Sequence, residues 1–144
     1  MKIDSIFEMW EQDSPIDRQR LDEAALNISS LHAKYHRIYT NERLVLRKYE
    51  GEMAELKLQK YEFYTQGPTK ETVEKGWQLP PIGKIIKSDV GAYMEADRDI
   101  IHMNLKLGLQ HEKISLLESI IKNLQNRGYN IRAAVDYIRF IGGA

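Results

Sequence analysis

Four residues near the middle of the sequence have the types and spacing to bind a flat, anionic ligand. Lys57, Lys60, Tyr61 and Tyr64 stand at positions i, i+3, i+4 and i+7, so on a helix they share one face. Lysines neutralise phosphates, and aromatic rings stack on bases at about 1–3 kcal/mol per base. The stripe therefore predicts a surface for single-stranded nucleic acid. The same spacing also fits tyrosines that flank a core, with lysines extending over it to solvent.

Positive charge is concentrated around this stripe, although the net charge of the whole chain is zero. Residues 34–60 hold seven basic and four acidic side chains, whereas residues 1–33 hold three basic and seven acidic ones. Because local fields steer charged partners, we expect the basic segment to extend the DNA-binding surface. Its further members are Lys34, Arg37, Arg43, Arg47 and Lys48. Three of them (Lys34, Arg37 and Lys48) share a helical face. Basic residues with such spacing are also common on helix faces that only contact solvent.

The remaining chemistry-bearing residues form no catalytic pattern. His32 and His36 are four residues apart and could bind a metal ion side by side, but no third ligand has a convincing spacing. The Gly83-Lys84 pair lacks the earlier glycine of a phosphate-binding loop, and no Ser/His/Asp set has a family-like spacing. We therefore expect a protein that is not an enzyme and has no metal and no cofactor. A metalloenzyme centred on the two histidines is the alternative.

Composition restricts the class of protein further. The 144 residues, of which 42% are hydrophobic and 29% charged, fit a single helical domain, 1–144, with a packed core. The absence of cysteine excludes disulfides and thiol chemistry and indicates a reducing compartment. No apolar run approaches the roughly 20 residues of a membrane span, and acidic residues occupy positions where a signal peptide is apolar. We therefore expect no membrane partner.

Hydrophobic spacing predicts an all-α fold built on a long antiparallel helical hairpin. A short N-terminal helix near residues 3–12 is followed by a start signal at Ser14-Pro15. Residues 17–64 contain no proline and a single glycine, Gly51, so they predict one long helix. Such a helix spans about 70 Å, whereas a compact globule of this size is about 40 Å across. It must lie against a second long helix or another subunit, unless it breaks near Asn41-Glu42 or Gly51.

The second half of the chain predicts the returning helix and a short terminal helix. Residues 65–87 hold three of the four prolines and are typical of a loop, with one helical turn inside it. A second long helix is expected over 88–127, apolar on more than one side and ending at Gly128. A C-terminal oligomerisation helix, 131–141, follows. Its apolar stripe consists of Ile131, Ala134, Val135, Ile138 and Ile141.

Four segments carry a resemblance to a known family. The first runs from Ile16-Asp17 to Lys34-Tyr35, and the second joins Leu56-Lys57 to Lys60 and Tyr64. The third is Ala96–Ile100, and the fourth begins with Arg127-Gly128-Tyr129. In order and spacing, from about residue 16 onward, these segments resemble the UvsY family of recombination mediators of T-even-type bacteriophages. Residues 1–14 align poorly, the loop has no matching pattern, and the second segment needs a one-residue shift.

The resemblance implies a function as well as a fold. Proteins like these bind single-stranded DNA without sequence preference and assemble as a ring-like homo-oligomer, expected to be a heptamer. They contact the phage recombinase and the phage single-strand-binding protein. Their task is to load the recombinase onto strands that the binding protein covers, in recombination, repair and recombination-dependent replication. The expected location is the cytoplasm of the infected bacterial host. A structural helical oligomer or adaptor that binds no nucleic acid is the competing hypothesis.

Overall fold

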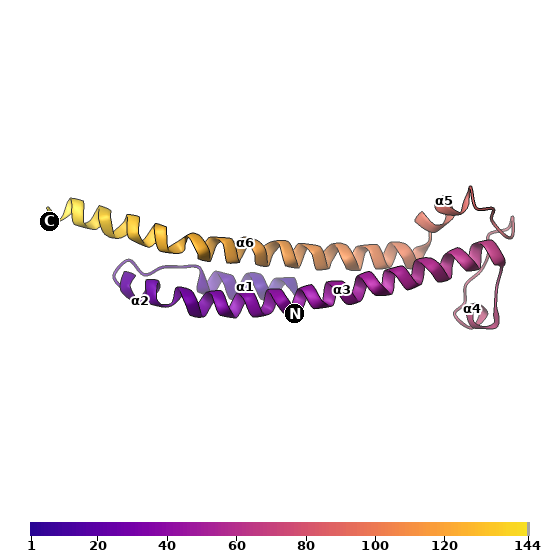
Figure 1. Cartoon of the computed structure of the whole chain (residues 1–144), viewed down its shortest axis with the longest axis horizontal. Coiled ribbons are helices and arrows are strands. Elements are labelled where there is room, and N and C mark those ends of the chain that lie inside the picture. Colours follow the sequence, from indigo (N-terminus) through magenta and orange to yellow (C-terminus); the bar gives the residue numbers. More distant parts are fainter. Residues whose placement is uncertain (144) are drawn as a thin grey trace. The chain divides into compact units, whose positions relative to one another are not determined.

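The computed structural model describes residues 1–143, which contain only helices and no strand. The elements are α1 (Ile3–Asp13), α2 (Leu21–Leu26), α3 (Ile28–Gln66), α4 (Lys70–Glu74), α5 (Val90–Glu95) and α6 (Arg98–Ile141) (Figure 1). The all-α prediction is confirmed. Within residues 1–143, every helix is too short or too polar to span a bilayer.

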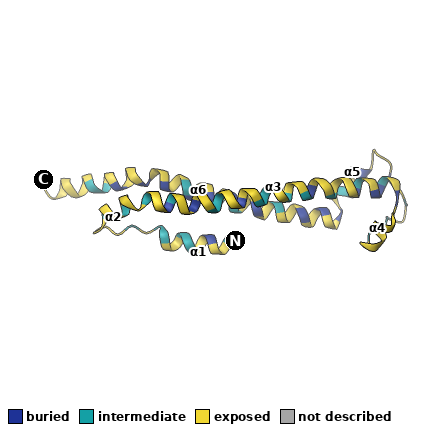
Figure 2. Cartoon of the chain, turned by 60° about the horizontal axis from the view of Figure 1, so that its bottom comes forward, coloured by how far each residue is buried: buried dark blue, intermediate teal, exposed yellow. Residues whose placement is uncertain are grey.

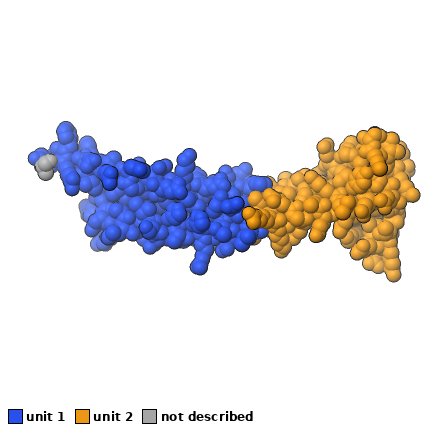
Figure 3. All heavy atoms as spheres, viewed as in Figure 1, with its two compact units in different colours: residues 1–44, 110–144 blue, residues 45–109 orange. Residues whose placement is uncertain are grey.

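The chain divides into two compact units, each of which has its own core (Figure 3). Unit 1 consists of Met1–Leu44 and the chain from Gln110 onward, and unit 2 is Val45–Leu109. The long helices α3 and α6 each contribute one part to unit 1 and one part to unit 2. Whether the chain behaves as the single domain expected from its length stays a prediction.

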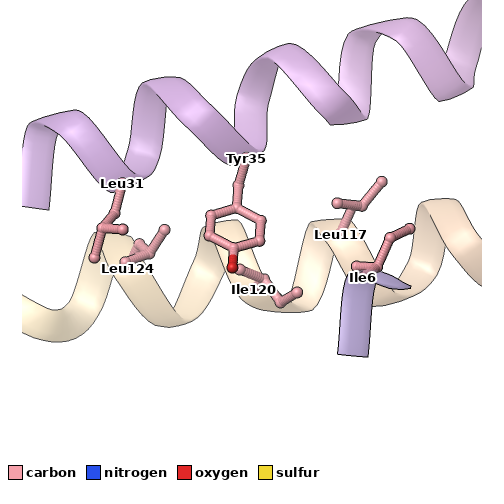
Figure 4. Packing of buried hydrophobic residues seen from close by; sticks show 6 residues of the cluster. All are labelled: Ile6, Leu31, Tyr35, Leu117, Ile120 and Leu124. Atoms are coloured by element: carbon pink, nitrogen blue, oxygen red, sulfur yellow. The ribbon is translucent and has the colours of Figure 1, made fainter. Parts of the chain in front are cut away.

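Three helices, α1, α3 and α6, lie side by side in unit 1 (Figure 1). Leu31 and Tyr35 of α3 point toward Leu124 and Ile120 of α6 (Figure 4). Ile6 of α1 closes this cluster and is fully buried. Because Leu31 meets a later part of α6 than Tyr35 does, the two long helices run antiparallel here.

Asp13, at the end of α1, fastens this helix to the core of unit 1. Its Oδ2 accepts hydrogen bonds from Lys34 Nζ at 2.6 Å and from the Tyr35 hydroxyl at 2.7 Å. Burial alone would raise the pKa of Asp13, but these hydrogen bonds and the positive charge of Lys34 outweigh it and lower the pKa. The carbonyls of Asp13 and Ser14 accept hydrogen bonds from the Arg127 guanidinium of α6. The sequence therefore positions α1 through polar as well as apolar contacts.

Unit 2 contains two small clusters of buried residues. In the first, Met53 of α3 packs with Ile100 and Met103 of α6, and the helices again run antiparallel. In the second, Phe63 and Tyr64 at the end of α3 pack with residues of the connecting segment 67–97. The remaining buried members of that cluster are Ile85 and Val90. Along α3 and α6 in each unit, the buried positions form a stripe on one side of the helix, and the residues on the other side are exposed (Figure 2).

The first long helix differs in its bounds from the predicted 17–64. It does not begin at Asp17, because the side chain of that residue accepts the Gln19 amide and its carbonyl accepts the Arg20 amide, which forms a turn instead. Asn27 then separates α2 from α3. Helix α3 continues unbroken through Asn41-Glu42 and Gly51. It ends where Gly67 adopts a φ of 96°, in the left-handed region that glycine favours.

The predicted end of the second long helix at Gly128 is wrong, and so is a separate helix at 131–141. Helix α6 runs through Gly128 to Ile141 without a break. Arg127 and Ile131, on either side of the glycine, are both buried in unit 1, and their packing outweighs the weak helix propensity of one glycine. The predicted start near Ser88 is also wrong. Helix α5 ends at Glu95, and Asp97 then caps a new helix by accepting the Asp99 and Ile100 amides.

The predicted loop at 65–87 contains one further ordered element. Helix α4 has a capping box, in which the Thr69 hydroxyl accepts the Thr72 amide and the Thr72 hydroxyl accepts the Thr69 amide. The single helical turn predicted inside the loop, around residues 70–75, is therefore confirmed, and five residues form it.

Candidate nucleic-acid interface

Lys60, the residue at the centre of the predicted DNA-binding stripe, lies in the interior of unit 2. It is 4% exposed, and its Nζ lies 3.1 Å from Asp97 Oδ2 and 2.7 Å from Asp99 Oδ2. The ammonium also lies 3.8 Å from the ring centroid of Trp77, a cation–π contact. With two carboxylates and an aromatic face around it, this ammonium has no access to a DNA phosphate.

Tyr64 belongs to the same buried cluster. Its hydroxyl donates a hydrogen bond to Asp97 Oδ2 at 2.6 Å. Burial, together with this hydrogen bond and the negative charge of Asp97, raises the pKa of Tyr64. Burial by itself would raise the pKa of Asp97, but the hydrogen bonds from Tyr64, Lys60 and the Ile100 amide keep it below its ordinary value. The cluster therefore holds an ionised aspartate and a neutral tyrosine at neutral pH.

The predicted exposed stripe is thus wrong for two of its four members. Lys60 and Tyr64 face the core, where they join the end of α3 to the start of α6. Tyr61 is half-buried and packs against the Phe63 cluster. Lys57 is the one member of the stripe that is exposed. The second interpretation of this spacing, in which the tyrosines pack at a core, is correct for Tyr61 and Tyr64.

The other basic residues predicted to bind DNA lie on the outside of their units. In unit 1, Lys34, Arg37 and Arg43 are exposed, and Lys34 is paired with Asp13 of α1. In unit 2, Arg47 and Lys48 are exposed, and Lys48 Nζ lies 4.0 Å from Glu52. Within residues 1–143, Arg37, Arg43, Arg47 and Lys57 form no ion pair with a carboxylate. Their DNA contacts stay a prediction.

Glu42 is the only acidic residue in the part of α3 that belongs to unit 1, residues 28–44. It is 5% exposed, and its Oε2 accepts a hydrogen bond from Gln110 Nε2 at 2.6 Å. Lys113 Nζ lies 3.9 Å from the same oxygen, and the amino group of Met1 lies 3.3 Å from Oε1. Because this carboxylate faces inward, every charged side chain on the outer surface of α3 in unit 1 is basic.

His32 and His36, the alternative metal ligands, stack on one another along α3. Their ring centroids are 5.8 Å apart and their planes differ by 18°. No group of three or more histidine, aspartate and glutamate side chains in residues 1–143 is arranged to hold a metal ion.

The predicted oligomerisation residues fall into two groups at the end of α6. Ile131 is buried in unit 1, and Ala134 and Val135 are half-buried. Ile138 and Ile141 are exposed. Three aromatic residues that the predicted stripe omitted, Tyr129, Tyr137 and Phe140, are exposed by 64% or more. The apolar surface at the end of α6 is therefore larger than the predicted stripe, and its role in assembly stays a prediction.

The model of the family described as "Recombination, repair and ssDNA binding protein UvsY" matches residues 9–144, which is nearly the whole chain. The chain belongs to the UvsY family. The resemblance seen in the sequence is thereby confirmed. Members of this family are recombination mediators and not enzymes.

Crystal structures of the bacteriophage T4 recombination mediator protein UvsY share the fold. One of them, lattice type II, superimposes with a TM-score of 0.80 at 18% identity and covers 99% of this chain and 98% of that chain. Another, lattice type IV, has a TM-score of 0.78 at 16% identity, with 97% and 98% covered. At this level of identity the likeness shows the fold. No curated protein sequence matches this chain.

In the structure the four UvsY-like segments meet in pairs. The second and third segments meet in unit 2, where Lys60 and Tyr64 contact Asp97. The first and fourth meet in unit 1, where Tyr35 and Arg127 both contact Asp13. The UvsY resemblance therefore rests largely on residues that hold the fold.

The packing partners of the predicted site were not apparent from the sequence. Trp77 and Asp97 enclose Lys60. Trp77 lies in the loop that has no counterpart in the UvsY-like pattern, and Asp97 lies in a segment of mixed charge. One signal for the position of Asp97 was available. An aspartate just before a helix commonly caps it, because its side chain accepts the backbone amides two and three residues later. No comparable local signal marked Trp77.

Proposed function

We propose that this chain is a recombination mediator that binds single-stranded DNA without sequence preference through the basic outer surface of α3. Membership of a family described by recombination, repair and single-stranded-DNA binding supports this function. The observation that carries the choice of surface is the inward orientation of Glu42, which leaves Arg37 and Arg43 without an acidic neighbour on the outer side of α3 in unit 1. Lys34 lies on another side of the helix and is paired with Asp13 of α1. Contacts between such cations and phosphates release counterions whatever the base sequence.

Unit 2 has candidate contacts of its own, Arg47, Lys48 and Lys57, which replace the buried Lys60 and Tyr64. Glu50, Glu55 and Glu62 are also exposed on this part of α3, so the positive field is weaker than in unit 1. We therefore assign the main phosphate contacts to unit 1.

Assembly would strengthen a surface that is weak in one copy. The net charge of the chain is zero, and only a few basic side chains of α3 are exposed, so a single copy can make only a few phosphate contacts. A homo-oligomeric ring, which we take to be a heptamer, would repeat these contacts, and linked contacts raise avidity without any new interaction. Exposed apolar side chains at the end of α6, notably Ile138, Phe140 and Ile141, supply a surface for a neighbouring copy.

The mediator role needs two further partners, the phage recombinase and the phage single-strand-binding protein. A strand held on the outer faces of such a ring is wrapped or bent, and this weakens its contacts with the binding protein. The recombinase then nucleates on the exposed strand. This process belongs in the cytoplasm of the infected host, where phage DNA is replicated and repaired.

Sedimentation velocity of the purified chain, with and without oligo-dT at low salt, tests the proposal. We expect a single oligomeric species that takes up oligo-dT and releases it as salt is raised. An oligomer that does not bind oligo-dT at low salt would instead support the alternative, a structural helical assembly or adaptor.

A further inference from the structure

A row of flat rings follows one flank of α3 in unit 1. His32, His36, Tyr39 and Arg43 succeed one another at intervals of four, three and four residues. The centroids of the two imidazoles are 5.8 Å apart, and those of His36 and Tyr39 are 6.1 Å apart. The Arg43 guanidinium lies 5.5 Å from the centroid of the Tyr39 ring. The basic surface of α3 therefore includes an aromatic component that is separate from its cations.

A hydrogen bond extends this flank onto α6. The Tyr39 hydroxyl donates to Glu118 Oε1 at 2.9 Å, and the hydrogen bond raises the pKa of Tyr39. Lys122 and Tyr129 follow Glu118 by four and eleven residues, so they lie on the same face of α6. Both are exposed, and Tyr129 is exposed by 73%. The flank of α3 and this face of α6 thus form one surface, which we call the ring face: His32, His36, Tyr39, Arg43, Lys122 and Tyr129.

Helix α1 leaves the ring face open. It is fastened to α3 through Asp13, which contacts Lys34 and Tyr35. Lys34 and Tyr39 are five residues apart, so they lie on opposite flanks of the helix. The ring face therefore combines two exposed rings, those of His36 and Tyr129, with two half-buried rings and two cations. The neighbouring carboxylate of Glu118 is engaged by Tyr39.

We infer that bases of single-stranded DNA stack on the His36 and Tyr129 rings of the ring face while Arg43 and Lys122 hold the adjoining phosphates. This inference rests on the proposed function and adds to it the path of the strand and contacts to bases. Rings stack on any base because every base has a π-face, and cations on either side meet the backbone. A surface of this composition selects single strands, because the bases of a duplex are already stacked on one another.

Titration of fluorescent oligo-dT with His36→Ala and Tyr129→Ala tests the inference, with His36→Phe and Tyr129→Phe as controls that keep a ring. We expect each alanine variant to bind about tenfold more weakly and each phenylalanine variant to bind close to the wild type. The salt dependence should stay that of the wild type, because neither change removes an ammonium or guanidinium. His102→Ala, an exposed histidine of α6 in unit 2, should bind normally.

Photo-crosslinking of the unaltered chain to oligo-dT that contains 5-iodouracil gives a second readout that does not depend on the folding of a variant. Crosslinks at His36 or Tyr129 are expected. Normal binding by both alanine variants, equal losses in the alanine and phenylalanine variants, or crosslinks confined to other surfaces would overturn the inference and leave the proposed function standing. If the wild type does not bind oligo-dT at all, the proposed function itself fails.

Discussion

The Nζ atom of Lys60 lies 3.1 Å from Oδ2 of Asp97, and each side chain is only 5% exposed. A buried ion pair costs desolvation free energy on both sides, and removing one partner leaves the other charge uncompensated. The pair, with the Tyr64 hydroxyl beside it, fixes the end of α3 to the first turn of α6. A lysine in such a setting stabilises the fold, whereas Lys57, one turn earlier and exposed, is free to contact a ligand.

Replacing these two lysines by alanine should therefore have opposite consequences. Lys60→Ala should lower the free energy of unfolding by about 3–5 kcal/mol, because Asp97 stays buried without its partner. Lys57→Ala should change it by less than about 0.5 kcal/mol. Urea unfolding followed by the fluorescence of Trp77, in a Trp10→Phe background, measures the stability close to the cluster. A Lys60→Ala variant with wild-type stability would show that the pair does not hold the fold.

The same cluster predicts how stability depends on pH. The pKa of Asp97 is lowered in the folded chain, so its contribution is present above the unfolded value of about 3.9 and is lost as the pH falls through the folded value. The pKa of Tyr64 is raised, so its contribution is present below about pH 10 and is lost as the pH rises further.

Urea unfolding between pH 2 and 11 checks both directions, with Asp97→Asn and Tyr64→Phe as comparisons. Asp97→Asn should flatten the acid limb of the stability profile, and Tyr64→Phe should flatten the alkaline limb. Tyr35 also has a raised pKa, so some alkaline loss should remain in Tyr64→Phe. Unaltered limbs in the two variants would contradict the assignment of the linkage to this cluster.

Two glycines should respond in opposite ways to substitution by alanine. Gly128 is inside α6, and an added Cβ would meet no atom within 4 Å, so Gly128→Ala should raise stability by about 0.5–1 kcal/mol. Gly67 has a φ of 96°, and a Cβ there would lie 3.0 Å from Lys84 Cε, so Gly67→Ala should be destabilising. Thermal unfolding by circular dichroism measures both. Destabilisation by Gly128→Ala would indicate that the helix needs a break at that position.

Assembly is better tested by substitution than by truncation. Cutting the chain after Gly128 would also remove Ile131, which is 6% exposed and belongs to the core of unit 1. Ile138→Ser with Ile141→Ser changes only exposed side chains, so the helix content should stay constant while the oligomer shifts to smaller species. Sedimentation velocity distinguishes the outcomes, and an oligomer of unchanged size would exclude this surface as the interface.

The helical fold was accessible from the sequence because its signals are local. Apolar spacing predicted both long helices, and the loop-like composition from residue 65 onward predicted the C-terminus of the first within two residues. The boundaries that failed depend on tertiary contacts. Nothing near Gly128 in the sequence reveals that Arg127 reaches the carbonyls of Asp13 and Ser14, so the helix was expected to stop.

The predicted site was limited by the same cause. Helical spacing places Lys57, Lys60, Tyr61 and Tyr64 on one side of α3, but it does not say whether that side faces solvent or another helix. Met53 and Phe63 are buried on the adjacent face of α3. Lys60 and Tyr64 are buried as well because they contact Asp97, a residue far away in the sequence. Buried Glu42 is a comparable case, since its partner Gln110 is distant too.

The salt dependence of oligo-dT binding by Arg37→Ala with Arg43→Ala is the most direct test of the basic surface on α3. We expect weaker binding and a slope of log Kd against log salt that is smaller by up to about 2 per protomer. Arg18→Ala with Arg20→Ala, a pair of exposed arginines among the N-terminal acidic residues, should keep the wild-type slope. An unchanged affinity and slope in Arg37→Ala with Arg43→Ala would contradict the proposal that this surface of α3 binds the strand.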